Sequence, residues 1–87
     1  MPYYVCVYDV SVDRVQKALR LFRRYLTWVQ NSVFEGELTL AQYAELEAKA
    51  QDLFEAQDSL IVCEMRTGRY VERKVVGVER GETGRFL

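Results

Sequence analysis

Hydrophobic and polar positions alternate along the 87-residue chain with two periods, one typical of strands and one of helices. Residues 3 to 10 are β-branched and aromatic on both faces, which predicts a central strand covered on two sides. Helical spacing follows, and it predicts an amphipathic helix of about fourteen residues with Ser11 as its N-cap. The inward positions of that helix are Val15, Ala18, Leu19, Phe22 and Leu26.

The middle of the chain returns to strand chemistry and then to a second helix. Residues 28 to 35 read as a strand, and residues 36 to 38 indicate a second strand or a bulge, with the hairpin turn unplaced. Thr39 and Gln42 have the spacing of a capping box, in which each side chain accepts from the other residue's backbone N–H. The helix that they open is expected to run to about Phe54.

Two more strands close the pattern. Residues 58 to 65 and 70 to 78 are predicted strands, joined by a turn at Thr67 and Gly68. The order β-α-β-β-α-β with an extra C-terminal strand predicts a ferredoxin-like α+β sandwich. We expect one domain over residues 1–78, followed by a flexible tail at 79–87.

Composition narrows the class of protein. A chain of 87 residues with 49% hydrophobic content has the make-up of one globular domain, and so small a core gains stability from a homodimer. No apolar run approaches the roughly 18 residues that span a bilayer, and no basic leader precedes the first strand. We therefore expect a cytoplasmic protein without a membrane segment.

The chain contains no histidine, and this excludes several kinds of catalytic site. Ser-His-Asp and Cys-His nucleophiles, imidazole bases and His-ligated zinc all require that side chain. Hydrolysis by this chain would depend on carboxylates and a hard cation. Cys6 and Cys63 lie in apolar strand patterns without metal-ligand spacing, which favours reduced core thiols.

Net charge is only −1, but cations and anions are unevenly spread. Two basic regions flank an acidic one at residues 35–58. In the first, four cations share one face of the predicted helix and could follow a nucleic-acid backbone: Arg14, Lys17, Arg20 and Arg24. In the second, Arg66 and Arg69 flank the predicted turn as further phosphate contacts. A solvated helix face is the alternative meaning of such a stripe.

Asp9 ends the first strand, where a carboxylate lies at the rim of the sheet. One carboxylate supplies one or two of the six oxygens that Mg²⁺ prefers, but a two-fold axis would bring a second Asp9 to the same ion. The alternative is an aspartate that only starts the following helix. Tyr8, Ser11 and Phe34 lie near Asp9 in the pattern, with strand, cap and core roles favoured for them.

The chain resembles the small CRISPR-associated Cas2 family in three segments. These are a first strand that ends in Tyr8-Asp9, the segment Val29-Gln30-Asn31-Ser32-Val33-Phe34-Glu35-Gly36, and a late strand that opens at Asp58. The likeness runs from Tyr3 to about Val78. It implies a homodimer whose last strand joins the partner's sheet, and it implies Asp9 as the metal ligand and catalytic residue, with Mg²⁺ or Mn²⁺. Trp28 departs from the pattern, because many members carry a basic residue there.

The resemblance implies a subunit of CRISPR adaptation, which bridges Cas1-type integrase dimers and holds duplex DNA. It leaves open whether the chain is also a metal-dependent endonuclease, and whether the substrate is single-stranded RNA or DNA. Two alternatives stand beside it. One is a VapD-like toxin endoribonuclease that uses the same aspartate, and the other is a non-enzymatic ferredoxin-like RNA-binding module.

Overall fold

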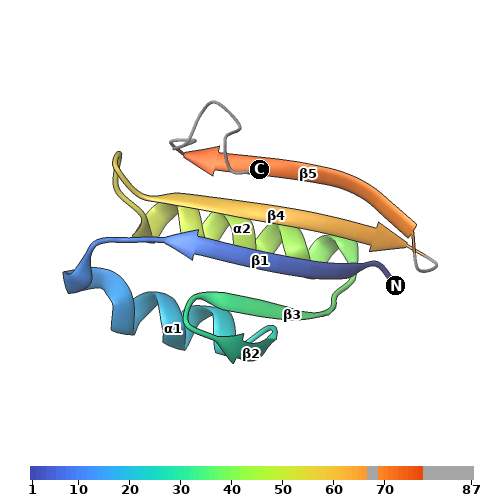
Figure 1. Cartoon of the computed structure of the whole chain (residues 1–87), viewed down its shortest axis with the longest axis horizontal. Helices are drawn as coiled ribbons and strands as arrows, with labels where there is room; N and C mark the ends of the chain where they lie inside the picture. The colour runs from blue at the N-terminus through green and yellow to red at the C-terminus, as the bar shows by residue number, and fades with distance from the viewer. Residues whose placement is uncertain (67–68, 78–87) are drawn as a thin grey trace.

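The structure, a computed structural model, describes residues 1–66 and 69–77, with side chains for 1–66 and 73–77 (Figure 1). Over that part of the chain the helices and strands follow the predicted order. Their bounds are β1 Tyr3–Asp9, the 3₁₀ turn η1 Val12–Arg14, α1 Val15–Arg23, β2 Thr27–Gln30, β3 Val33–Glu37, α2 Leu40–Leu53, β4 Ser59–Arg66 and β5 Arg69–Gly77. The predicted turn at residues 67–68 and the tail at 79–87 lie outside the described residues.

One antiparallel sheet holds all of these strands in the order β2-β3-β1-β4-β5 (Figure 1). Its first four strands have the arrangement of a ferredoxin-like sandwich, so the predicted fold class is confirmed. The single strand predicted over residues 28–35 is wrong, because the chain turns at Asn31 and Ser32 and so forms two strands, β2 and β3. β1 lies at the centre, and its last residue, Asp9, is paired with Ser59 at the start of β4.

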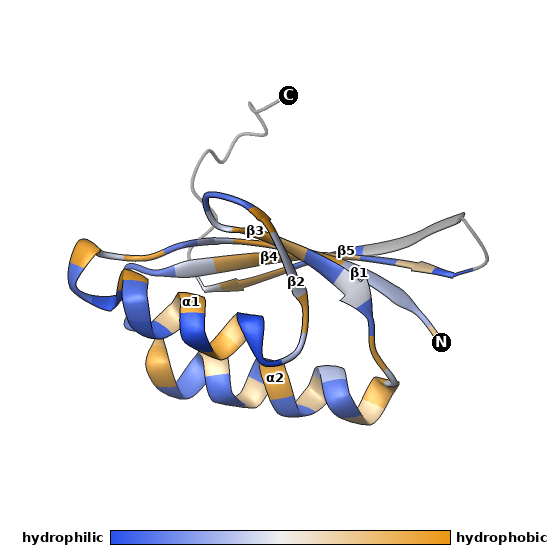
Figure 2. Cartoon of the chain, turned by 90° about the horizontal axis from the view of Figure 1, so that it is seen from below, coloured by the Kyte–Doolittle hydropathy of each residue, from blue (hydrophilic) through white to orange (hydrophobic). Residues whose placement is uncertain are grey.

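Both helices cover the same face of the sheet (Figure 2). Alternate residues of β1 point toward them, and Tyr4, Cys6 and Tyr8 are buried there. The Tyr8 ring lies 5.0 Å from the Phe22 ring of α1, centroid to centroid, and 5.9 Å from that of Phe34. The hydrophobic core therefore lies between β1, β3 and the helices.

The opposite face of the sheet has no covering layer among the described residues (Figure 2). Val5 and Val7 of β1 point to this open face. The residues of β4 that pair with them are Cys63 and Ile61, respectively. β1 was predicted to be covered on two sides, and within one chain it is covered on one. No helix in the described ranges is long and apolar enough to cross a membrane.

The second helix begins and ends as predicted. Thr39 Oγ1 accepts from the Gln42 backbone N–H at 3.0 Å, and Gln42 Oε1 accepts from the Thr39 N–H at 2.9 Å. Leu46 and Ala50 are buried in the core, with Tyr43 and Leu53 packed against it. Both cysteines are free thiols, Cys6 buried beneath the helices and Cys63 half-buried on the open face.

The first helix differs from its prediction. A 3₁₀ turn, η1, occupies Val12–Arg14, and α1 proper has only nine residues. Ser11 precedes the turn, but its side chain makes no capping hydrogen bond to the backbone. The reason is competition, because the Ser11 hydroxyl accepts instead from Arg14 Nη2 at 2.8 Å.

The last strand lies at an edge of the sheet in this single chain. β5 pairs with β4 of the same chain from Ser59 and Gly77 at one end to Arg66 and Arg69 at the other. The implied pairing of this strand with a partner's sheet concerns a second chain and stays a prediction.

Candidate functional site

Asp9 lies in an open pocket at the end of β1. The pocket has a volume of about 290 Å³, close to the lower end of the range for small-molecule pockets. Its lining comes from three parts of the chain: Tyr8, Asp9, Val10, Val15, Asn31 and Ser32. Asp9 and Asn31 are exposed, whereas the Tyr8 ring belongs to the core. A small polar ligand could therefore reach the Asp9 carboxylate from solvent.

The β2–β3 turn supplies the other polar side chains that line this pocket, those of Asn31 and Ser32. Asn31 has a φ of 46°, a left-handed conformation that asparagine tolerates better than most residues. The Tyr8 backbone N–H donates to the Ser32 carbonyl at 3.2 Å, so this turn is fastened to the end of β1. Neither Asn31 nor Ser32 was predicted as a site residue, although an asparagine between two strand patterns is a recognised turn signal.

The oxygen atoms in the pocket are of the types that bind a hard cation, but they are fewer than the six that Mg²⁺ prefers. A carboxylate, an amide oxygen and a hydroxyl are groups that Mg²⁺ or Mn²⁺ accepts. Among the described residues, however, no group of three or more Asp, Glu, Cys or His side chains could hold a metal ion. A complete site therefore needs water or a second copy of the chain in addition to Asp9, Asn31 and Ser32.

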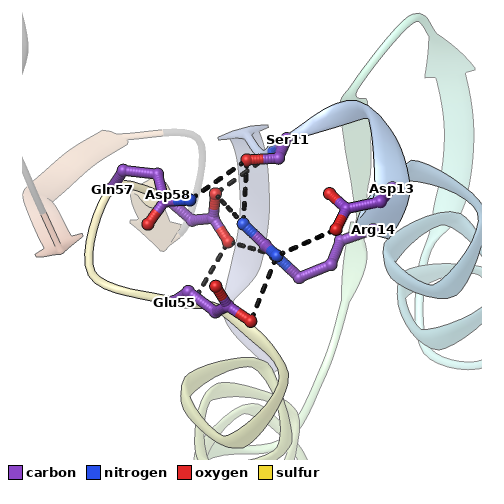
Figure 3. A network of polar contacts seen from close by, with 6 residues as sticks. All are labelled: Ser11, Asp13, Arg14, Glu55, Gln57 and Asp58. Atoms are coloured by element: carbon purple, nitrogen blue, oxygen red, sulfur yellow. Dashed lines mark hydrogen bonds and ion pairs between the residues drawn. The ribbon is translucent and has the colours of Figure 1, made fainter.

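Arg14 lies away from the predicted basic stripe, in a buried network at the same end of the sheet (Figure 3). Its side chain is 8% exposed and forms a two-pronged pair with Asp58: Nε donates at 2.6 Å and Nη2 at 3.0 Å. Glu55 and Asp13 approach Nη1 at 3.2 and 3.6 Å. With its guanidinium turned inward to carboxylates, Arg14 is not placed to contact a nucleic-acid backbone in this structure.

Asp58 is the centre of this network. Its carboxylate also accepts from the backbone N–H groups of Ser11, at 3.2 Å, and Glu55, at 2.8 Å. The hydrogen bonds from Arg14 are the main reason that the pKa of Asp58 is lowered, and burial opposes them. An ionised Asp58 therefore joins the segment after β1 to the segment before β4.

Three of the other cations predicted to contact phosphate lie on one helix. Lys17, Arg20 and Arg24 are exposed at helical spacing along α1 and its C-cap. Arg66 is half-exposed at the far end of β4 and pairs with Glu64 at 2.6 Å. Arg69 begins β5, and its side chain lies outside the described part of the chain.

Phe34 and Trp28 have structural surroundings that bear on the alternatives. Phe34 is fully buried on the helix-covered face, so it cannot stack on an RNA base as the RNA-binding alternative requires. Trp28 is half-exposed, and its indole N–H donates to the Asn31 carbonyl at 2.8 Å. The residue that departs from the resembled pattern thus supports the turn beside Asp9.

A model of the family described as CRISPR associated protein Cas2 matches residues 1–73. The chain belongs to the Cas2 family. It is similar to a CRISPR-associated endoribonuclease Cas2 of Dictyoglomus turgidum, with 41% identity over 98% of this chain and 99% of that protein. A protein with the same description from Thermococcus kodakarensis is 43% identical over 90% of this chain and 91% of its own. A solved structure described as a crystal structure of Cas2 superposes with a TM-score of 0.73 at 40% identity, covering 92% of this chain and 91% of that one.

Proposed function

We propose that this Cas2-family chain is a metal-dependent endoribonuclease whose site is the Asp9 pocket. The observation that carries the proposal is an exposed carboxylate beside an amide and a hydroxyl in an open pocket at a strand end. Curated relatives at about 40% identity over almost the whole chain are described as endoribonucleases, which supports it. Membership of this family also favours a CRISPR-associated role over the toxin alternative.

Asp9, Asn31 and Ser32 would hold Mg²⁺ or Mn²⁺ through oxygen atoms. When bound, such a cation supplies an activated water nucleophile and neutralises charge that develops on the phosphate. The chain's own residues orient the site: β1 fixes Asp9, and the bond from Tyr8 to Ser32 holds the turn against it. With a single carboxylate among the described residues that line the pocket, and no histidine in the chain, we expect slow chemistry.

The open sheet face supports a homodimer that would complete this site. One row across the sheet runs from Glu35 through Val5 and Cys63 to Arg73, with opposite charges at its two ends. A two-fold axis parallel to the strands, between β1 and β4, would place Glu35 of one copy near Arg73 of the other. The same axis brings the two Asp9 residues to the same end of the interface.

The exposed cations of α1 favour a second function, in CRISPR adaptation. Lys17, Arg20 and Arg24 lie on an exposed helix face and could hold the backbone of duplex DNA. In this role the dimer would bridge Cas1-type integrase dimers and hold the middle of the DNA fragment. Neither task uses the Asp9 pocket, so the two functions can be tested separately.

Replacement of Asp9 by asparagine tests the nuclease proposal. Asp9→Asn keeps the size of the side chain and removes the charge that holds a hard cation, so we expect RNA cleavage in Mg²⁺ or Mn²⁺ to fall at least about a hundredfold. Cleavage of a labelled single-stranded RNA is measured for both proteins, with a single-stranded DNA of the same sequence in parallel.

Asp52→Asn is the matched control, because Asp52 is an exposed carboxylate of α2 that does not line the pocket. It should cleave as the wild type does. Asp9→Asn should also retain duplex-DNA binding and assembly with an integrase, because those rest on other surfaces. Cleavage by Asp9→Asn at the wild-type rate would show that Asp9 only begins the following turn.

A further inference from the structure

Three segments that are distant in the sequence meet at Asp58, beside the Asp9 pocket. Asp58 lies between α2 and β4, Arg14 ends η1, and Gly77 ends β5. Gly77 has a φ of +96°, and a Cβ atom there would collide with the Asp58 carbonyl oxygen. The backbone of β5 thus packs directly against the backbone of Asp58. The Asp58 side-chain carboxylate, in turn, accepts hydrogen bonds from Arg14 and Ser11.

We propose that Arg14 and Asp58 are positioning residues, a buried clamp that fixes the backbone after Asp9 and so aims the Asp9 carboxylate into its pocket. This inference rests on the proposed cation site at Asp9. The clamp acts on the protein chain and not on the ligand, since neither Arg14 nor Asp58 lines that pocket.

The geometry of the two strands shows how the clamp reaches Asp9. On one side Asp9 is paired in the sheet with Ser59, the residue after Asp58. On the other side, two residues along the chain, the Ser11 N–H is bound to the Asp58 carboxylate at 3.2 Å. Only Val10, which also lines the pocket, lies between these two fixed points. A change at Asp58 therefore frees the segment next to Asp9.

The side chain of Ser11 ties the segment further. Ser11 Oγ accepts from Arg14 Nη2 at 2.8 Å and from Gln57 Nε2 at 3.3 Å. Arg14 thus binds the Asp58 carboxylate and the Ser11 hydroxyl with one planar guanidinium (Figure 3). Lysine carries the same charge but cannot reproduce that fork, so the conservative exchange Arg14→Lys separates charge from geometry.

Asp58→Asn is the principal test, because it preserves shape while replacing an acceptor oxygen by an N–H donor that faces other donors. We expect hydrogen exchange at the Ser11 amide to become at least about tenfold faster, and the Mn²⁺ concentration that half-broadens the Val10 and Asn31 amide signals to rise about tenfold. RNA cleavage should show a lower kcat with little change in KM. Arg14→Lys should shift the same three quantities in the same direction, by less.

Leu46→Val is the matched control for a general loss of stability, since Leu46 is buried in α2 and lies outside the clamp. It should lower the melting temperature while leaving the Mn²⁺ midpoint and Ser11 exchange unchanged at temperatures well below unfolding. The positioning role is overturned if Asp58→Asn binds Mn²⁺ as the wild type does, or if Leu46→Val weakens it equally. Wild-type protein without Mn²⁺ broadening near Asp9 would instead overturn the proposed cation site itself.

Discussion

At the scale of single residues, one side chain's role depends on which face of the sheet it occupies. Cys6 and Cys63 are both strand cysteines, yet Cys6 is fully buried under the helices and Cys63 is half-buried on the open face. Burial raises the pKa of the Cys6 thiol from an ordinary 9.0 to about 12, with a smaller effect from Cys63. The folded protein therefore favours the neutral thiol of Cys6.

This shift predicts a specific loss of stability in alkali. A raised folded pKa contributes stability that is fully present below the unfolded pKa of about 9 and is lost as pH rises toward 12. Relative to Cys6→Ala, which has no thiol to ionise, the wild type should lose about 1.4 kcal/mol of unfolding free energy per pH unit above about 9. Urea unfolding of both proteins at pH 7, 9 and 10 measures this, and parallel pH dependences would contradict it.

At the scale of elements, α1 has two different chemistries along its length. Its start is drawn into the Arg14–Asp58 network, where the cation is neutralised by buried and nearby carboxylates. Its exposed face further along keeps Lys17, Arg20 and Arg24. The helix looks uniformly basic in sequence, but its two parts have different roles. The cation at its start stabilises the fold, and the exposed cations further along are candidates for phosphate binding.

Duplex-DNA binding tests that division of α1. Ala at Lys17, Arg20 and Arg24 together should weaken binding and reduce the slope of log K against log salt by up to about 0.9 for each lost phosphate contact. Binding of a mixed-sequence duplex is measured by fluorescence anisotropy at several salt concentrations. The matched control replaces three charged side chains of α2 by Ala, at Glu45, Lys49 and Asp52, and should not reduce the slope. An unchanged slope in the α1 variant would mean that its cations are only a solvated face.

At the scale of the whole molecule, the helices cover one face of the sheet and leave the other open. The open face carries apolar residues on three neighbouring strands, including Val7, Ile61 and Val75. Val7 is more than a third exposed in the single chain. A continuous apolar surface of this kind marks a protein interface, and here the proposed occupant is a second copy.

A charge at the centre of that face should prevent the dimer. Val7→Arg should give a particle near the 10.2 kDa chain mass, whereas the wild type should have twice that mass. Ala48→Arg adds the same charge on the exposed side of α2 and should stay dimeric. Sedimentation equilibrium over a range of concentrations measures the masses, and a monomeric wild type would refute the proposed interface.

The local pattern of residues in the sequence was sufficient to predict most of the helices and strands. The capping box at Thr39 and Gln42 was predicted correctly because it depends only on residues three apart. Asp9 was placed correctly at the end of β1 because apolar periodicity marks where a strand stops. The burial of Phe34 followed from its position in a strand pattern.

Contacts between distant segments were decided only by the tertiary structure. Arg14 and Asp58 are 44 residues apart, and nothing local in the sequence distinguishes that arginine from Lys17 or Arg20. Likewise, Asn31 and Ser32 reach Asp9 only because β3 pairs with β1. The amino-acid sequence by itself determined which segments become strands and helices and which carboxylate ends the central strand, since those depend on local spacing. The fold decided which charges are buried against one another and which side chains share a pocket, because those depend on strand pairing and layer packing.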